Sequence, residues 1–358
     1  MSNMLPMKKK ENKFRKFFQR IFNLPREQKS IYEQPKLKIE LDNVEKTFRE
    51  SCKEPQAQIN IEPGSLDYAI DQFLTACEYF AMRTGKLDFY KVLIKLGAMS
   101  MQDNKINKGE EESLVERLED SRKFSIYTQK SGNMEPAFYH IKTHKYKECT
   151  TEKVRIYLNA KRSNVALLAG KLLSKFQNDN FYLKFSSDHE LASSERSEAI
   201  VIYTDPINIS NIINKIQELE RESPELFEGA ENKNPFMKSI GNIAYAPNPE
   251  NDVYIDRNNK MKKVGKSYNS FLSKALEESF VEAAKEIIAK DKDLKIKSKG
   301  VVSNDPAFYL QYLEDIKNNH YRDFLNIIKK ELRDAQKRNG VLDIKNIYED
   351  RDEKRYEQ

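Results

Sequence analysis

Three basic side chains stand on two short stretches whose composition is typical of β-strands. Residues 153–159 read KVRIYLN, and residues 180–185 read NFYLKF. Alternate side chains of a strand lie on the same face of its sheet, so Lys153 and Arg155 share one face. Lys184 stands at the equivalent position of the second stretch. If the two strands are neighbours, their sheet presents a cluster of cations with few carboxylates.

Such a cluster is suited to two kinds of chemistry. Arginine grips a phosphate through two parallel hydrogen bonds. Cations held together also favour an unprotonated lysine amine, because protonation adds a repelled charge, and such an amine is a general base. Arg196 precedes a third strand-like stretch, 199–204, and is expected to reach the rim of this face. From the pattern alone, the plainer interpretation is the solvated face of an amphipathic sheet.

Cysteine and histidine spacing does not predict a metal or redox site. Cys52, Cys77 and Cys149 are far apart and match no zinc or redox spacing, which favours inert thiols in a reducing cytoplasm. His140 and His144 lie close in the sequence, but no nearby carboxylate completes a metal site. We therefore predict no metal, no cofactor and a cytoplasmic protein, with secretion as an effector left open.

The excess positive charge lies near residue 1. The formal net charge is +6, and residues 1–30 carry nine Lys or Arg against two Glu, so the rest of the chain is nearly neutral. A general nucleic-acid binder would spread basic residues over its folded domain, so no nucleic-acid partner is predicted.

The basic arm also carries an apolar face at helical spacing. Its members are Phe14, Phe17, Phe18, Ile21 and Phe22. Three interpretations stay open: a helix that docks on the body or a partner, a mostly disordered tail, and a helix over residues 8–22 in weak contact with a membrane surface.

Length and composition indicate a folded chain. Among its 358 residues, 39% are hydrophobic and 33% charged, and 19 Phe and 18 Tyr provide enough apolar surface for a core. No apolar stretch approaches the ~18 residues of a transmembrane helix, so integral membrane association is not predicted.

The apolar spacing predicts an α+β fold: a small mixed or antiparallel sheet with helices before, within and after it, and mainly helical N- and C-terminal thirds. Expected helices are 65–83 with Ser65 as N-cap, 87–99, 110–122, 163–176 with Ser163 as N-cap, 208–222, 268–290, 306–318 and 320–338. Expected strands are 137–142, 153–159, 180–185, 199–204 and 235–246, the last with a turn at Gly241. Residues 247–266 are expected to form a loop.

These elements suggest four regions. They are a basic arm and polar connector over 1–60, a helical subdomain over 61–125, an α+β domain over 130–290, and C-terminal helices with a frayed polar tail over 291–358.

An ordered set of motifs between about residue 130 and residue 290 resembles the HopA family of type III secretion effectors. Relatives of that family also occur in bacterial clusters that modify lanthipeptides and thioamide peptides. The motifs are KVRIYLNAK with the helix after it, FYLKF, RSEAIVIYTD with its Ile-rich helix, PELFEGAENKNPF, IAYAPNPE and SYNSFLSKALEESF. More distantly, the same order is similar to the phosphothreonine lyases of the OspF and SpvC class.

The resemblance implies a metal-independent carbon–oxygen lyase that eliminates phosphate from phosphorylated Ser or Thr of a peptide or protein, leaving a dehydroamino acid. In those lyases a lysine removes the α proton, a histidine protonates the leaving oxygen, and arginines hold the phosphate. Lys184 matches the base, and Arg196 matches a phosphate-binding arginine. Arg257 aligns weakly with another. Arg155 stands where the lyases have their histidine and becomes a further phosphate ligand.

The general acid is therefore open in this sequence. Tyr157, Lys153, His140 and His189 are the substitutes considered, and a well-neutralised phosphate can also leave without a proton.

Two function hypotheses follow from the resemblance. The first is the lyase, acting on a phosphorylated peptide or protein with a kinase-like partner protein. The second is a non-catalytic, effector-like or partner-binding protein that keeps the anion pocket, and Arg155 in place of histidine favours it. Retention of Lys184 and Arg196 favours the first.

Overall fold

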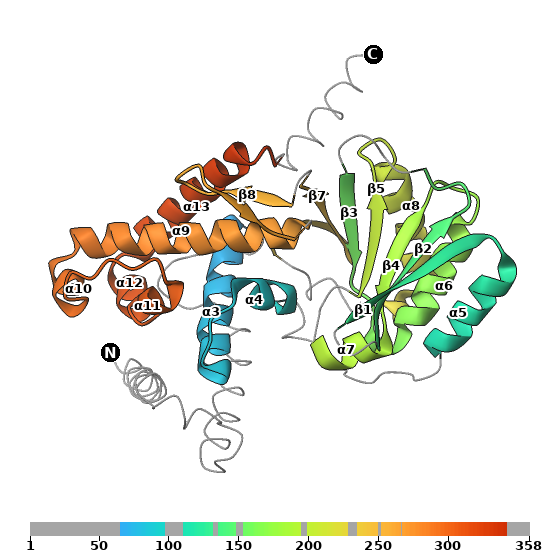
Figure 1. Ribbon diagram of the computed structural model, residues 1–358, viewed down its shortest axis with the longest axis horizontal. Helices are drawn as coiled ribbons and strands as arrows, with labels where there is room; N and C mark the ends of the chain where they lie inside the picture. The colour runs from blue at the N-terminus through green and yellow to red at the C-terminus, as the bar shows by residue number, and fades with distance from the viewer. Residues whose placement is uncertain are drawn as a thin grey trace, which may run out of the picture. The chain divides into compact units, whose positions relative to one another are not determined.

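The computed structural model describes residues 65–96, 110–131, 135–147, 153–194, 199–227, 235–249, 252–265 and 267–341 (Figure 1). The basic arm predicted over residues 1–60 lies outside these residues. The described residues fall into two compact units. One comprises those up to Val92 together with Ser279–Lys329, and the other comprises Leu93–Glu278 together with those from Lys330 on.

The larger unit is built on one antiparallel sheet of seven strands in the order β1-β2-β4-β5-β3-β7-β6 (Figure 1). The strands are β1 (Phe124–Ser131), β2 (Glu135–Thr143), β3 (Lys153–Leu158), β4 (Tyr182–Ser186), β5 (Ile200–Thr204), β6 (Lys238–Ile240) and β7 (Ile243–Asn248). The strands that carry Arg155 and Lys184 are therefore neighbours of the same strand, β5, on its two sides.

Three helices cover one face of this sheet: α5 (Glu110–Ser121), α6 (Val165–Phe176) and α8 (Ile209–Glu222) (Figure 1). Every second residue of the central strands packs against them, and Ile156, Leu183 and Ile202 are fully buried there. The strict alternation of strand side chains then sends the residues between them to the opposite face. Two 3-10 turns, η4 (Arg162–Asn164) and η5 (Pro224–Leu226), and the short helix α7 (Asp188–Ser194) connect these elements.

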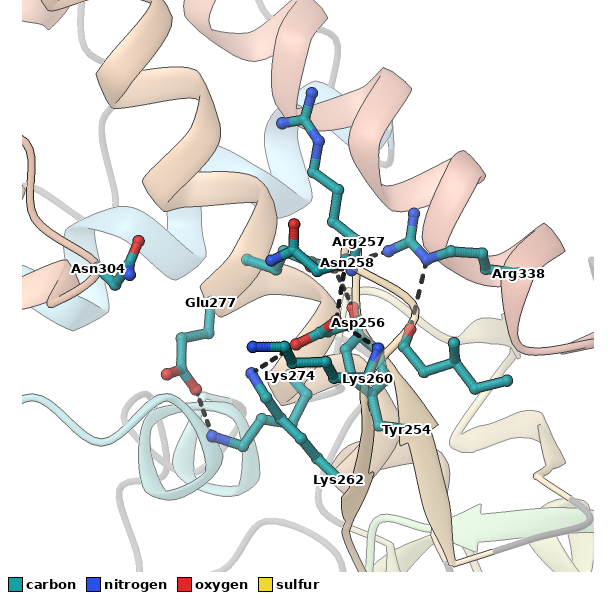
Figure 2. Close-up of polar contacts among 12 residues, drawn as sticks. Tyr254, Asp256, Arg257, Asn258, Lys260, Lys262, Lys274, Glu277, Asn304 and Arg338 are labelled. Carbon is teal, nitrogen blue, oxygen red and sulfur yellow. Dashed lines mark hydrogen bonds and ion pairs between the residues drawn. The ribbon is translucent and has the colours of Figure 1, made fainter.

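A two-stranded hairpin of β8 (Val253–Ile255) and β9 (Met261–Lys263) also belongs to this unit. Figure 2 shows its turn, where the carboxylate of Asp256 accepts hydrogen bonds from the backbone N–H groups of Asn258 and Lys260, both at 2.9 Å. These bonds, with the backbone of Lys260 contributing most, hold the pKa of Asp256 below its ordinary value. The prediction of a loop over 247–266 was therefore wrong, because strands of three residues are too short for an alternation to be recognised.

The same unit contains the first part of α9 (Tyr268–Lys290) and the last part of α13 (Tyr321–Arg338). Glu278 of α9 accepts hydrogen bonds from the Tyr254 hydroxyl at 2.6 Å and from the Arg338 guanidinium at 2.7 Å. These bonds attach the hairpin to both helices.

The smaller unit is helical. It contains α3 (Leu66–Thr84), the start of α4 (Phe89–Lys95), the remainder of α9 and α13, α10 (Lys292–Lys297), α11 (Pro306–Leu310) and α12 (Leu313–Asn319). Phe73, Phe280 and Phe324 are among its fully buried side chains. The Lys317 amine lies 2.9 Å from the Glu78 carboxylate, which compensates the cost of enclosing both charges.

The structure confirms the predicted α+β class and the antiparallel sheet within it, as well as the N-cap at Ser65, whose hydroxyl accepts from the Tyr68 N–H at 3.1 Å. It corrects details elsewhere. Asn164, not Ser163, occupies the N-cap of α6, because a 3-10 turn precedes that helix. Strand β1 and helix α10 were missed, and the expected helix 306–318 is broken into α11 and α12. No helix among the described residues is long and apolar enough to cross a membrane.

Gly241 lies in the turn between β6 and β7, and substitution there tests how closely the β6–β7 hairpin is packed. Its φ is +55°, and a Cβ there would lie 2.9 Å from a carboxylate oxygen of Glu220. That carboxylate accepts from the Asn242 amide at 2.6 Å. We expect Gly241→Ala to lower the free energy of unfolding by about 2 kcal/mol, as the sum of left-handed strain and a disturbed buried hydrogen bond.

The matched control is Gly340→Ala, because Gly340 has a φ of +60° and nothing within 4 Å of the added Cβ. It should cost about 1 kcal/mol, from strain alone. Chemical denaturation of both variants measures the difference, and equal losses would show that Glu220 yields without cost.

Candidate functional site

The sheet face opposite the helices carries a row of functional side chains. His140 on β2 is paired with Lys184 on β4, Lys184 with Val201 on β5, and Val201 with Tyr157 on β3. Because neighbouring strands lie about 4.8 Å apart, Lys184 and Tyr157 start about 10 Å apart with the shorter Val201 between them. The predicted base is thus flanked by a histidine on one side and a tyrosine on the other.

A second row runs beside the first. Lys142 is paired with Tyr182, Tyr182 with Tyr203, and Tyr203 with Arg155. The rings of Tyr182 and Tyr203 stack at 4.3 Å, and the Arg155 guanidinium carbon lies 5.0 Å from the centre of the Tyr203 ring. The two aromatic rings therefore form a continuous support between the two cations of this row.

Each cation on this face lies over an aromatic ring. The Lys184 amine is 4.1 Å from the centre of the Phe138 ring, and the Lys142 amine is 5.1 Å from that of Tyr182. Such contacts stabilise a cation by its attraction to the negative face of the ring. Lys184 and Arg155 remain half-buried, whereas Tyr157 and Val201 are only 4% and 5% exposed. The charged ends of Lys184 and Arg155 therefore lie next to closely packed, buried side chains.

His140 is buried in the middle of this arrangement. Its ring stacks on that of Tyr127 at 4.5 Å, and its Nδ1 lies 2.6 Å from the Tyr182 hydroxyl. Its Nε2 lies 3.2 Å from the side-chain oxygen of Gln129. An amide oxygen can only accept, so Nε2 carries the proton and Nδ1 accepts from Tyr182. The hydroxyl of Tyr182 also lies 2.7 Å from the hydroxyl of Tyr127, which extends this series of hydrogen bonds.

The pKa of the His140 imidazole is lowered to about 4, and the charges of this face contribute to the shift. Burial is the largest cause, and the charges of Lys184, Lys142 and Arg155 add to it in that order. All three lie close enough to oppose a further positive charge on the imidazole. Burial and the positive charges of the face together keep His140 neutral at pH 7.

The structure brings together part of the predicted site. Lys184, Arg155 and Tyr157 lie on one face, as the alternation predicted. Lys153 begins β3, paired with Asn248 of β7.

The other predicted residues are not gathered there by the described structure. Arg196 lies outside the described residues. His189 is exposed on α7, after the end of β4. Arg257 lies in the turn of the β8–β9 hairpin, where its guanidinium is 3.8 Å from the Glu331 carboxylate. A role for these three in phosphate binding or catalysis remains a prediction.

Sequence reasoning gave His140 only a minor place and overlooked Tyr127, Gln129, Lys142 and Tyr203. A signal was present for two of them: within the stretch AFYHIK, His140 and Lys142 alternate with Tyr139 and Ile141. Strand β1 carries a shorter alternation, in which Phe124 and Ile126 pack against the core and Ser125 and Tyr127 are exposed, and this signal was overlooked. Within the described part of the chain, no group of three or more His, Cys, Asp or Glu side chains could hold a metal ion.

These features define an α+β protein whose antiparallel sheet has one helix-covered face and one cationic, aromatic face. The family model described as the HopA1 effector protein family matches residues 129–308, half of the chain. The chain therefore belongs to the HopA1 effector family, and the matched region holds the strands of the cationic face.

Solved structures show a looser similarity. The effector protein from Pseudomonas syringae pv. syringae strain 61 is 15% identical, with 58% of this chain and 87% of that chain covered and a TM-score of 0.39. The effector protein from Pseudomonas syringae pv. tomato strain DC3000 is 11% identical, with 75% and 96% covered and a TM-score of 0.40. No curated protein matches the chain. The family assignment rests on the sequence match alone.

The charge of Lys184 should be measurable at His140. We expect Lys184→Met to raise the pKa of His140 from about 4 towards its ordinary value, because one of the opposing charges is removed. The pH dependence of the imidazole C–H resonances in NMR spectra reports this pKa. Lys130→Met, at an exposed position of β1, is the control. An unchanged pKa in Lys184→Met would mean that the amine does not act on the imidazole.

Stability should depend on pH through the same group. The pKa of His140 is lower in the folded protein than in the unfolded chain, where it is near 6.5, so the unfolded state binds the extra proton first. The stability contributed by neutral His140 is complete above pH 6.5 and is lost as the pH falls towards 4. Compared with His140→Gln, the wild type should lose up to about 1.4 kcal/mol more per pH unit in this window. Urea denaturation at several pH values measures both slopes, with His189→Gln as a second histidine variant; parallel slopes for wild type and His140→Gln would contradict the assignment.

Proposed function

We propose that this protein is a phosphoserine or phosphothreonine lyase that acts on a peptide or protein at the cationic face of its sheet. The observation that carries the proposal is the placement of Lys184, Lys142 and Arg155 on one sheet face beside the buried His140, whose pKa is lowered by burial and then by these three charges. Three cations that converge on one buried group form a site whose positive potential a phosphate dianion would neutralise. Family membership supports the proposal, because the match covers all three positions.

In the proposed reaction, the Lys184 amine removes the α proton of the phosphorylated residue. The electron pair of that C–H bond forms the Cα–Cβ double bond, and the Cβ–O bond breaks with its electron pair leaving on phosphate. The products are a dehydroamino acid and inorganic phosphate, and the balance consumes no water. Arg155 stabilises the negative charge on the departing phosphate. The resemblance to the lyases implies the same role for Arg196.

Lys184 suits the role of base because of its position. It lies in the centre of a strand that is paired on both sides. A base on a rigid strand keeps one geometry towards the bound substrate, which is what proton abstraction requires.

Two side chains that flank Lys184 can supply the proton for the leaving oxygen. Tyr157 is a neutral donor in the row of Lys184. His140 becomes a donor only if its pKa rises, and a bound phosphate dianion raises it by opposing the surrounding cations. Of the four candidates, these two fit the described geometry best, because His189 is exposed on α7 and Lys153 lies at the start of β3.

The partners follow from the family and from the chemistry. A HopA1 effector acts, in this proposal, on a protein of the host cell into which it is delivered by type III secretion. A substrate that already carries phosphate requires a kinase to supply it, so a kinase-like partner acts before this protein.

The decisive comparison is Lys184→Arg against the wild type. Arginine retains the cation that attracts phosphate but cannot serve as a base near pH 7. We expect the variant to bind phosphopeptides and to have no elimination activity. Mass spectrometry of a phosphoserine and phosphothreonine peptide library detects elimination as loss of phosphoric acid, whereas hydrolysis leaves the hydroxyl in place.

Arg155→Met separates the roles further. It should weaken phosphopeptide binding by about 10- to 100-fold, the effect of losing a charged hydrogen-bonding partner, in a fluorescence polarisation assay. Lys130→Met, exposed on β1, serves as the charge-matched control. Elimination that survives in Lys184→Arg would show that the base assignment is wrong.

A non-catalytic, phosphate-binding protein is the second candidate. Both ring nitrogens of His140 already have partners within the fold, Tyr182 and Gln129, and Arg155 replaces the histidine of the lyases. This hypothesis expects the wild type to bind phosphopeptides without any loss of phosphoric acid, also when a candidate kinase is present.

A further inference from the structure

A second surface, in the helical unit, combines exposed aliphatic side chains with lysines. Ile296 at the end of α10 is 74% exposed, and Val301 and Val302, just after that helix, are 49% and 77% exposed. Within the described part of the chain, three of the eight exposed large hydrophobic side chains fall in these seven residues. A cluster of this kind is typical of a contact surface, whereas single exposed hydrophobic residues are common.

Three exposed lysines lie near the isoleucine. Lys292 precedes Ile296 by four residues on α10, Lys295 is its neighbour in the sequence, and Lys299 follows in the turn after the helix. The opposite face is buried, with Leu294 at 2% and Ser298 at 3% exposure. Because the opposite face of α10 is buried, the Ile296 side chain is directed outward near these positive charges.

Two of the other charges near this surface have partners in the fold. Asp291 caps α10 and lies 2.6 Å from the His320 imidazole. Lys297 is paired with Asp315 of α12 at 2.9 Å. Asp293 is exposed and precedes Ile296 by three residues, so one carboxylate stands beside the isoleucine among the lysines.

The turn after α10 is fixed by hydrogen bonds. The N–H of Gly300 donates to the Lys295 carbonyl and that of Lys299 to the Ile296 carbonyl, both at 3.0 Å. Lys299 and Gly300 have φ values of +54° and +64° in this turn. A helix end with these two bonds reverses the chain tightly, so Val301 follows close to the last helical turn.

The far side of the turn is held as well. The Tyr309 hydroxyl accepts from the Ser303 N–H at 2.9 Å and donates to the Ser303 carbonyl at 2.8 Å. Both ends of the segment 296–302 are therefore anchored, and its exposed aliphatic side chains are presented by an ordered turn.

We propose that this surface, defined as Lys292, Lys295, Ile296, Lys299, Val301 and Val302, docks on an anionic membrane. Aliphatic side chains without a deep anchor give only weak insertion, and lysines alone give only weak electrostatic attraction. Aliphatic insertion and electrostatic attraction together give stable binding to a membrane, whose interior is apolar and whose surface is negatively charged. An acidic protein would satisfy the lysines, but exposed valine and isoleucine without an aromatic or arginine anchor lack the usual composition of a protein interface.

The test is co-sedimentation of the full chain with phosphatidylcholine vesicles that contain or lack phosphatidylserine. The wild type should bind the phosphatidylserine vesicles far more tightly. The triple variant Lys292→Gln, Lys295→Gln, Lys299→Gln should bind about fivefold less per lysine removed. The variant Ile296→Ser, Val302→Ser should also bind less, at unchanged charge.

Two controls separate this surface from the net charge and from the fold. Lys86→Gln, Lys263→Gln, Lys337→Gln removes the same charge from exposed positions elsewhere and should leave binding largely unchanged. Replacing the same three patch lysines by arginine should retain binding. Thermal melting checks that the variants, all at exposed positions, remain folded.

Equal losses in the patch and control triple variants would assign binding to overall charge and overturn the proposal. Absence of binding by the wild type, or equal binding with and without phosphatidylserine, would overturn it too and leave an acidic protein as the occupant to test. The result is independent of the lyase assay, because none of the substituted residues lies on the cationic sheet face.

Discussion

The alternation of side chains along β3, β5 and β4 is the constraint on which the cationic face depends. Leu183, Ile202 and Ile156 are fully buried against the helices, and their neighbours are thereby directed to the other side. A shift of one residue in β4 would bury the Lys184 amine and expose Leu183, at a cost the core does not permit. The same packing that stabilises the sheet therefore positions the charged groups, and no separate device is needed to hold them in register.

Placing several cations on one closely packed face costs free energy, because they repel one another and lose water. Aromatic rings reduce this cost: Phe138 lies under Lys184 and Tyr203 under Arg155. They do not remove the positive charges, which contribute, after burial, to the lowered pKa of His140. A folded protein that retains such an imbalance is stabilised when an anion binds, which is consistent with the phosphorylated ligand of the proposed function.

The sequence was sufficient to predict the parts of the site that follow from regular alternation. Lys184 and Arg155 lie on apolar–polar strands long enough to be recognised, so their common face was predictable. The pairing of His140 with Lys184 was not, because it depends on the order of strands in the sheet, in which β2 lies beside β4. The β8–β9 hairpin was missed for a different reason, because strands of three residues leave no recognisable pattern. Strand β1 was overlooked although Phe124 and Ile126, which pack against the core, alternate with Ser125 and Tyr127.

In the proposed lyase reaction, Arg155 in place of a histidine changes what is required of the proton donor. A permanent cation cannot deliver a proton at neutral pH, but it holds more of the charge that develops on the departing phosphate. Loss of a dianionic phosphate group without a proton would leave a trianion, so cations beside the departing oxygen reduce the need for an acid. Arg155 and Lys142 together with a protonated Lys184 after proton abstraction surround that charge on three strands. The buried His140 then matters less as an acid than as a neutral group whose hydrogen bonds to Tyr182 and Gln129 fix the aromatic support beneath the cations.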